Sequence, residues 1–301
     1  MNNKLLTIFT PTYNRIDLLQ RCYEYLKKQT SDNFKWLIVD DGSTDNTEEV
    51  VSKWLNEKNF FEIRYVKKTN GGLHTAYNVA VENMDTELCM CIDSDDYPSE
   101  NSVELIEKCW NSRNKSKEYA GIIGLDYKIN GELVGGNIDK FDEINLVDWT
   151  MGKYPVKKGD KKLVVRVDLY KLVFPMKKYK NEKNYNPNYM NIKIGFDKNY
   201  IALDECLCYV DYQDDGMTNS MLWQYYNSPN SFRDIRLLYL SFPNASLKFR
   251  IKNTIHYISS SILAKRNIFS DVNNKFLTFI CLPFGFALSK YIIFKNSKQL
   301  Y

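Results

Sequence analysis

Residues 5–82 read as three successive units, each a short apolar strand followed by a polar loop and an amphipathic helix. The strands are expected at Leu5–Thr10, Trp36–Val39 and Phe61–Val66. Strand, loop and helix in repetition require right-handed crossovers, which predict a parallel sheet with helices on its faces. Ligands of such sheets bind outside the carboxyl ends of the strands. We therefore expect an α/β fold with a ligand site along one edge of the sheet.

A fourth apolar run, Leu88–Ile92, leads directly into Asp93-Ser94-Asp95-Asp96. Carboxylates at the end of a buried strand repel one another and are costly to desolvate unless positive charge lies among them. Paired Asp oxygens suit a hard cation such as Mg²⁺ or Mn²⁺, which usually also holds substrate phosphates. A solvated acidic loop is the alternative, because the tripeptide Asp-x-Asp is common by itself.

Polar segments follow all four expected strands. They are Pro11–Arg15, Asp40–Asp45, Asn70–Asn78 and Asp93–Asp96. In a parallel sheet these segments gather along one edge, and together they outline a nucleotide and metal site.

The same segments resemble the motifs of the family 2 glycosyltransferases in order and spacing. The matching stretches are Thr7–Arg15, Gln29-Thr30, Val39–Asp45, Asn70–Gly72 with Asn78, and Asp93–Asp96. The resemblance implies a GT-A fold, an α/β, Rossmann-like and mostly parallel sheet flanked by helices. It also implies transfer of a sugar from a nucleotide diphosphate donor, with inversion at the anomeric carbon.

The resemblance implies roles for the residues that would meet the base. Pro11 and Tyr13 would border it, with the Tyr13 ring as a flat apolar surface against uracil. Asp40 or Asp41 would accept a hydrogen bond from the pyrimidine N3–H, which favours a UDP-sugar, since cytosine N3 carries no hydrogen. We prefer Asp40 for this role and expect Asp41 to turn toward the loop.

Other matching residues would meet the diphosphate. Gly71 and Gly72 would let the backbone pass close to it, because side chains there would collide. Asp93 would approach the ribose or the metal, and Asp95 would coordinate Mn²⁺ or Mg²⁺ bridging the phosphates. The implied donor set is Pro11, Tyr13, Arg15, Asp40, Asp41, Asn70, Gly71, Gly72, His74, Asn78, Asp93 and Ser94, with Asp93 and Asp95 as metal ligands.

Several of these residues also have a purely structural interpretation. Tyr13 is one of 22 tyrosines and could be a packing residue. The segment Asp40–Ser43 could be only a turn and a helix cap. His74 could contact phosphate or simply begin a helix. Many relatives have a basic residue directly before the position of Asn78, where this chain has a tyrosine, so positive charge would come from His74, Lys68 or the metal.

An inverting transferase needs a carboxylate on the acceptor side to remove the proton of the attacking hydroxyl. Relatives with this carboxy-terminal pattern carry Glu-Lys-Phe-x-Pro-Glu, followed later by Tyr-x-x-Asp-Gly. Here Asn188 follows Pro187, and an amide cannot act as the base. We rank Glu182 first as the base and Asp215 second, with Asp214 beside it, unless the enzyme is slow or inactive.

The chain shows no linker, low-complexity tract or repeat, and 301 residues with 44% apolar content can bury a large core. We expect a nucleotide-sugar-binding core in residues 1–125, an acceptor-side part in 126–216 and a helical region in 217–301. Asn130-Gly131 predicts a two-residue hairpin turn. The segment Lys177–Asn191 could be a mobile loop that closes over the substrates or an ordinary solvated loop.

The cysteines and the amino terminus indicate a cytoplasmic protein. Seven cysteines are an odd number without Cys-x-x-Cys, which favours buried free thiols over disulfides or metal ligation. Leu5–Thr10 is too short for a signal-peptide core, so we expect no secretory signal there.

The carboxy-terminal part differs in charge from the rest. From Lys248 onward nine Lys or Arg stand against one acid, Asp271. This part therefore carries +8, while residues 1–247 carry −4 of the total of +4. A basic tail on a mildly acidic body suggests an anionic surface as partner.

An apolar block lies within this basic tail. Phe276–Ser289 has no charge, and extension to Phe294 reaches nineteen residues only by including Lys290 and Pro283. A span needs about 20 apolar residues. We expect an element that lies in the cytoplasmic membrane interface, with a core helix and a true span as alternatives. The residues that would meet anionic headgroups are Lys275, Lys290, Lys295 and Lys298.

Together these observations predict a metal-dependent inverting hexosyl- or N-acetylhexosaminyltransferase. It would use a UDP-sugar to extend a glycan or lipid-linked glycan acceptor at the inner face of the cell membrane, in capsule, exopolysaccharide or cell-wall assembly. The alternative is a catalytically inactive sugar-nucleotide-binding partner in a membrane glycan-assembly complex. A nucleotidyltransferase would need a basic, glycine-rich phosphate loop, which Pro11–Arg15 is not. Nucleic acid is a poorer partner, because the basic tail carries an apolar block and no recognised binding module.

Overall fold

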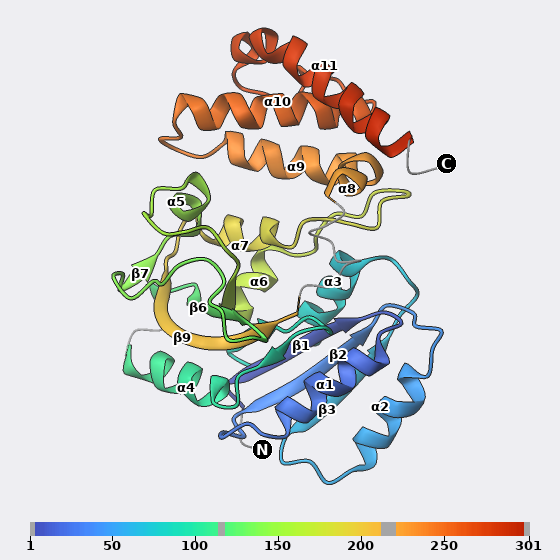
Figure 1. The fold of residues 1–301 in the computed structure, drawn as a ribbon, viewed down its shortest axis with the longest axis vertical. Helices are drawn as coiled ribbons and strands as arrows, with labels where there is room; N and C mark the ends of the chain where they lie inside the picture. Colours follow the sequence, from blue (N-terminus) through green and yellow to red (C-terminus); the bar gives the residue numbers. More distant parts are fainter. Residues whose placement is uncertain (1–3, 114–117, 212–220, 298–301) are drawn as a thin grey trace. The chain divides into compact units, whose positions relative to one another are not determined.

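The computed structural model describes residues 4–113, 118–211 and 221–297. The chain forms two compact units (Figure 1). Unit 1 consists of Met1–Pro175 and Met190–Gln213, and unit 2 of Met176–Tyr189 and Asp214–Tyr301. The predicted functional division at residues 125 and 216 follows a different criterion and stays a prediction.

Four parallel strands begin the sheet of unit 1 (Figure 1). They are β1 (Leu6–Thr12), β2 (Phe34–Asp40), β3 (Glu62–Lys67) and β4 (Leu88–Cys91). Their spatial order is β3-β2-β1-β4, and all three pairings are parallel, as the sequence predicts. Because the chain moves outward from β1 to β3 and then returns to the other side of β1, the topological switch point lies between β1 and β4.

The sheet continues beyond β4 with mixed strand directions. The added strands are β5 (Tyr97–Pro98), β6 (Gly121–Lys128), β7 (Glu143–Ile144), β8 (Lys161–Arg166) and β9 (Tyr200–Val210). β8 pairs antiparallel with both β4 and β6, and β6 pairs parallel with β9. β5 and β7 both pair antiparallel with β9. The α/β class is confirmed, with the purely parallel part confined to the first four strands.

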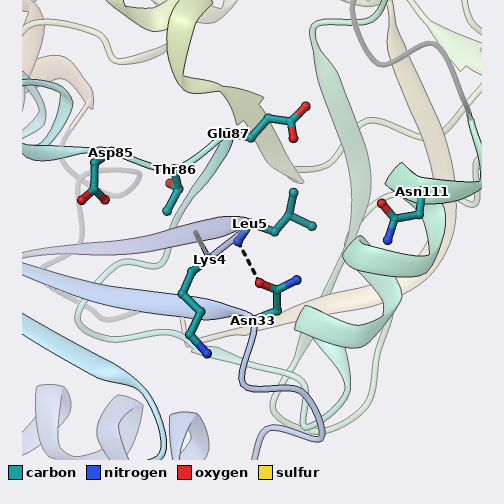
Figure 2. Close-up of a pocket in the computed structure, with 7 residues that line it drawn as sticks. All are labelled: Lys4, Leu5, Asn33, Asp85, Thr86, Glu87 and Asn111. Atoms are coloured by element: carbon teal, nitrogen blue, oxygen red, sulfur yellow. Dashed lines mark hydrogen bonds between the residues drawn. The ribbon is translucent and has the colours of Figure 1, made fainter. Parts of the chain in front are cut away.

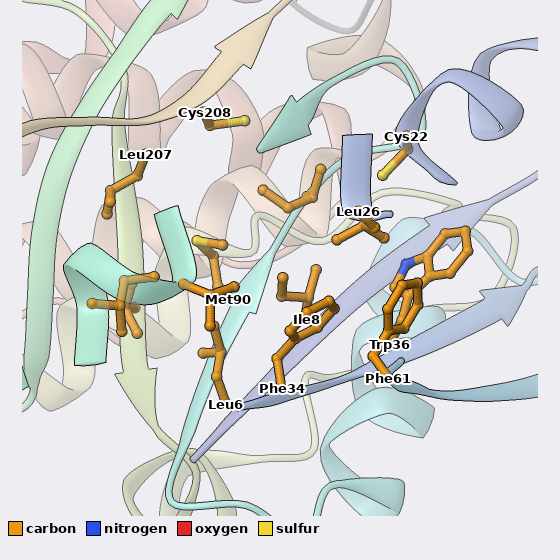
Figure 3. Close-up of a cluster of buried hydrophobic side chains, with 14 of the residues drawn as sticks. Leu6, Ile8, Cys22, Leu26, Phe34, Trp36, Phe61, Met90, Leu207 and Cys208 are labelled. Carbon is orange, nitrogen blue, oxygen red and sulfur yellow. The ribbon is translucent and has the colours of Figure 1, made fainter. Parts of the chain in front are cut away.

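Helices cover both faces of this sheet. The helices of unit 1 are α1 (Ile16–Leu26), α2 (Thr47–Asn56), α3 (Leu73–Asn83), α4 (Ser102–Ser112), α5 (Leu146–Met151), α6 (Val167–Val173) and most of α7 (Asn188–Ile194). Alternate strand residues point to opposite faces. Ile8 and Trp36 therefore enter the core shared with α1, α2 and α4 (Figure 3). Phe9 contacts Tyr77 of α3 on the other face, with ring centroids 4.9 Å apart.

Two details of the predicted elements are wrong by a few residues. The turn at Asn130-Gly131 has three residues rather than two, because Lys128 N donates to Glu132 O. Gly131 takes the left-handed conformation (φ +83°) that a bulged three-residue loop requires. The expected loop over Lys177–Asn191 ends early, since α7 begins at Asn188.

Unit 2 contains four helices in its described residues. They are α8 (Met221–Asn227), α9 (Pro229–Leu240), α10 (Leu247–Leu263) and α11 (Lys275–Ser297). Its core is built around Tyr257, Ile258 and Cys281. Gly285 lets α11 approach α10 closely, because a Cβ there would lie 2.4 Å from Ile258 Cγ2. All seven cysteines of the chain are free thiols, as predicted.

Candidate active site

The loops after β1, β2 and β4 meet at the carboxyl-terminal edge of the sheet. Asn14 Oδ1 accepts from Thr44 N at 2.7 Å, and Asn14 N donates to Ser43 Oγ at 2.9 Å. Asn14 has φ +51°, a left-handed conformation that Asn tolerates better than most residues. Arg15 Nη1 donates to Asp95 Oδ2 at 2.9 Å. The polar segments that the sequence places after three different strands are thus in contact.

Asp41 joins the loop after β2 to the loop after β3. Its carboxylate is buried and accepts from Gly71 N at 3.0 Å and from Gly72 N at 2.7 Å. Lys68 Nζ pairs with the same carboxylate, and Asn70 Nδ2 donates to Asp41 O at 2.9 Å. Asp41 does turn toward the loop. In this structure the backbone amides of Gly71 and Gly72, directly before α3, donate to the Asp41 carboxylate.

Asp40 is fully buried, and both of its oxygens accept hydrogen bonds. Ser43 N donates to Oδ1 at 2.7 Å, and the Tyr65 hydroxyl donates to Oδ2. Burial and the neighbouring Asp40 carboxylate raise the pKa of Tyr65, so the phenol stays a donor. Tyr65 was not identified from the sequence, where it is one residue of the expected third strand. Recognition of a base by Asp40 stays a prediction.

Asp93 and Asp95 follow β4 at the switch point. Asp93 is exposed, whereas Asp95 is partly buried. Burial and the charge of Asp93 raise the pKa of Asp95, and Arg15 opposes this shift. Two carboxylates that disfavour each other's charge are stabilised by a cation placed between them.

The donor set of this edge fits a divalent cation bound jointly by protein and substrate. Within residues 4–113, 118–211 and 221–297, no three His, Cys, Asp or Glu side chains converge into a metal-binding group. Asp93 and Asp95 would therefore supply carboxylate oxygens, and the remaining ligands would come from phosphate and water. Mg²⁺ is commonly bound in this way.

The other predicted donor residues lie on the same loops and on α3. Pro11 belongs to β1, and the Tyr13 side chain directly after it is 45% exposed, as a stacking surface requires. Ser94 is buried in the loop after β4. His74 and Asn78 are buried within α3, so His74 does begin a helix, and its contact with phosphate stays a prediction.

Glu182, our first choice for the base, caps a helix of unit 2. Its Oε1 accepts from Asn230 N at 3.0 Å and from Asn230 Nδ2 at 2.6 Å, and its Oε2 accepts from Ser231 N at 3.1 Å. An acceptor hydroxyl could reach this carboxylate only by displacing one of these donors, which carries the desolvation penalty of the groups released. This arrangement argues against Glu182. Asp214 and Asp215 lie outside the described residues.

A cavity of about 280 Å³ lies near the amino end of β1, away from these loops (Figure 2). Its polar lining is occupied by bonds within the protein. Leu5 N donates to Asn33 Oδ1 at 2.9 Å, and Lys35 Nζ donates to Asp85 Oδ2 at 2.9 Å. The loop edge, and not this cavity, is the candidate active site.

The part of the chain that carries these loops resembles known proteins. Residues 7–122 match the family described as glycosyl transferase family 2. The chain is 35% identical over 132 residues to the chondroitin synthase of Pasteurella multocida (strain Pm70), a match that covers 43% of this chain and 13% of the synthase. It is 32% identical over 104 residues to the glycosyltransferase GlyG of Streptococcus pneumoniae, covering 35% of this chain and 34% of GlyG. Residues 7–122 are therefore similar to glycosyltransferase family 2, and the chain spans only a minor part of the length of these relatives.

Solved structures of similar fold extend over most of the chain. S. aureus TarS 1-349 in complex with UDP has a TM-score of 0.57 at 20% identity, covering 85% of this chain and 70% of that one. The mannosyltransferase PcManGT from Pyrobaculum calidifontis, in complex with GDP-Man and Mn²⁺, has a TM-score of 0.57 at 16% identity, covering 100% of this chain and 88% of that one. These likenesses establish the GT-A-like fold of the chain.

Replacement of Asp41 by Asn should weaken the contacts between the loop after β2 and the loop after β3. The amide would present a donor to the Gly71 and Gly72 amides and leave Lys68 without its buried counter-ion. Breaking such a pair costs about 3–5 kcal/mol. We expect a loss of that size in urea unfolding, together with weaker binding of UDP in calorimetry.

Glu48→Gln is the matched control, because Glu48 pairs with Lys67 on the exposed surface. Exposed pairs contribute about 0–1 kcal/mol. Equal losses in the two variants would contradict the structural role of Asp41.

Proposed function

We propose that the chain transfers a hexosyl or N-acetylhexosaminyl group from a UDP-sugar to a glycan acceptor, with inversion. The observation that carries this proposal is the contact among the loops after β1 to β4, within residues that match family 2, with Asp93 and Asp95 in the loop next to the switch point. TarS was solved with UDP and with UDP-GlcNAc, and PcManGT with GDP-Man. The choice of uracil follows from the resemblance, and Asp40 could accept from the uracil N3–H only by sharing an oxygen with Ser43 N or the Tyr65 hydroxyl.

The donor would lie across the loops after β1 to β4. Pro11 and Tyr13 would border the base, and the exposed Tyr13 ring is suited to stack on it. Gly71 and Gly72 would let the backbone approach the diphosphate. Arg15, which pairs with Asp95, would supply positive charge beside it.

Asp93 and Asp95 would hold Mn²⁺ or Mg²⁺. The cation, when bound, would neutralise charge that develops on the departing diphosphate. The PcManGT complex contains Mn²⁺, which supports a divalent cation in this fold.

The acceptor hydroxyl must lose its proton as its oxygen attacks the anomeric carbon. The new bond forms there while the bond from that carbon to the diphosphate breaks, and UDP departs with the electron pair. A carboxylate must take the proton. Because Glu182 is engaged at α9, we propose Asp215, with Asp214 as its neighbour, for this role.

Asp95→Ala tests the transferase proposal. The variant should fold normally and lose both UDP release from UDP-sugars and the Mn²⁺-dependent part of UDP binding, because one of the two protein ligands is removed. A coupled UDP-release assay across a panel of UDP-sugars measures the first, and calorimetry measures the second. Glu82→Ala, an exposed acid on α3, is the control.

Retained activity in Asp95→Ala would remove the metal role. Binding of UDP-sugar by the wild type, without hydrolysis or transfer under any acceptor tried, would favour the alternative of an inactive sugar-nucleotide-binding partner. Asn188, which replaces the Glu of relatives, motivates that alternative.

The base assignment is tested by comparing Glu182→Gln with Asp215→Asn and Asp214→Asn. Glu182→Gln should lower the melting temperature, since a helix cap contributes about 1 kcal/mol, and leave turnover within about twofold. Asp215→Asn should lower turnover by about 100-fold or more with donor KM preserved, the usual scale of general-base loss. A Glu182→Gln enzyme that folds fully but does not turn over would return the role to Glu182.

We also propose that α11 lies on the cytoplasmic membrane surface. α11 is the one helix among the described residues that is long and apolar enough to cross a membrane by length and composition. In a helix of a soluble protein the large apolar side chains are packed inside and the polar ones are exposed, whereas α11 shows the opposite distribution. The side packed inside unit 2 consists mainly of small or polar residues, namely Thr278, Cys281, Gly285, Ser289, Ile292 and Asn296.

The exposed side of α11 is rich in large apolar residues. Phe276 is 76% exposed and Phe279 is 66% exposed, and further apolar side chains follow along the helix. The charges on the described part of α11 are Lys275, Lys290 and Lys295. An apolar surface flanked only by lysines fits an anionic bilayer interface, where the lipid-linked acceptor of our proposal would be found.

Phe279→Ser combined with Phe284→Ser should weaken binding to phosphatidylglycerol vesicles about tenfold or more, because each inserted Phe contributes about 1.5 kcal/mol or more. Co-sedimentation measures the bound fraction. Leu172→Ser, on α6 and 79% exposed, removes an isolated apolar side chain and should change nothing. Binding by the double variant equal to wild type would place any membrane contact elsewhere.

A further inference from the structure

A buried lysine lies behind the metal-binding loop. Lys162 of β8 has its ammonium nitrogen 3.7 Å from Asp96 Oδ2 and 3.7 Å from Asp126 Oδ1. The side chains of Lys162 and Asp96 are 11% exposed, and that of Asp126 is 3% exposed. Lysine is almost never buried unless it is paired, because desolvation of its charge is costly.

The electrostatics of this triad depend on the lysine. Burial favours the neutral amine, but the carboxylates of Asp126 and Asp96 outweigh it and hold the pKa of Lys162 well above its usual range. Burial raises the pKa of Asp126 to about 6, and Lys162 opposes the rise. Removal of the ammonium would leave two carboxylates in a dry site without their counter-ion.

Asp96 connects this triad to the loop after β4 and to the end of β9. It follows Asp95 directly in the chain, and its Oδ1 accepts from Asp211 N at 3.1 Å. Asp211 Oδ2 accepts from Arg21 Nη1 at 2.8 Å, and Arg21 Nη2 donates to the backbone oxygen of Asp95. The loop after β4 and the end of β9 are therefore held in one closed ring of contacts.

The chain continues from the end of β9 toward Asp214 and Asp215, three and four residues after Asp211. Asp96 thus contacts both the loop that carries the proposed metal ligands and the end of the strand that precedes the proposed base in the sequence. We propose that Lys162 is a positioning residue for sugar transfer: held between Asp96 and Asp126, it fixes Asp96 and, through it, the Asp93–Asp95 loop and the end of β9. This inference rests on the proposed function.

Three variants test the role of Lys162. Lys162→Met removes the positive charge of the triad. Lys162→Met with Asp126→Asn removes one charge of each sign. The double variant leaves only one buried carboxylate without its counter-ion, so we expect it to fold even where the single variant does not. Lys53→Met is the control, because Lys53 is an exposed lysine of α2 that pairs with Glu49 at 2.9 Å and lies outside the triad. Unfolding curves, turnover, donor KM and calorimetric binding of UDP with and without Mn²⁺ are measured for each.

We expect the folded double variant to lose about 10- to 100-fold in turnover and in Mn²⁺-dependent UDP binding, as for outer-shell partners of metal ligands. Metal-free UDP binding should stay within about twofold of wild type, because a residue with only a general structural role would move both. The control should match wild type throughout. A folded double variant with wild-type turnover and wild-type Mn²⁺-dependent binding would overturn the positioning role.

The binding measurements separate this inference from the transferase proposal. A wild-type protein that binds UDP with Mn²⁺ but transfers no sugar contradicts the proposed function, and the double variant's Mn²⁺-dependent binding then decides the role of Lys162. Absence of any Mn²⁺-dependent binding by the wild type overturns both.

Discussion

Several acidic side chains at the carboxyl-terminal edge of the sheet are largely shielded from water, so their negative charge must be balanced within the protein. The arrangement of the site depends on the ion pairs that achieve this. Asp41 is paired with Lys68, Asp95 with Arg15, and a further acid pair with Lys162. An unpaired buried carboxylate would take up a proton or destabilise the fold. Because each cation comes from a different loop or strand from its acid, every pair also ties two segments together.

The sequence predicts the local elements well because each is encoded by neighbouring residues. The period of the apolar residues and the polar residues between the apolar runs predict the four parallel strands and the loops that follow them. The sequence does not predict which residues of distant segments form ion pairs and hydrogen bonds with one another. Nothing near Lys162 marks it as the counter-ion of acids on two other segments, and Glu182 was ranked first as a base because its contact with a helix forty-eight residues later cannot be read from its neighbours. Asn130-Gly131 predicted a turn, but the left-handed Gly131 made it one residue longer.

The apolar carboxy-terminal segment shows a different limit of sequence reasoning. Its length and composition left a core helix, an interfacial helix and a span all open. The decision between them depends on which side of the helix is packed. Gly285 and Ser289 face the interior of unit 2, while Phe276 and Phe279 remain exposed, an arrangement common where helices pack closely and expose apolar residues to lipid. Packing, and not composition, therefore argues against a core helix.

Hydrogen bonds and ion pairs also divide the clustered acids into two groups. Asp40, Asp41 and Asp96 are buried, and both carboxylate oxygens of each interact with other parts of the protein. A ligand could reach them only by sharing or displacing those partners, which carries the desolvation penalty of the groups released. Asp93 is exposed, and Asp95 meets a half-exposed Arg15. Asp40, Asp41 and Asp96 are therefore committed to contacts within the protein, whereas Asp93 and Asp95 are the more accessible acids of this edge, which is why we assign the metal to them.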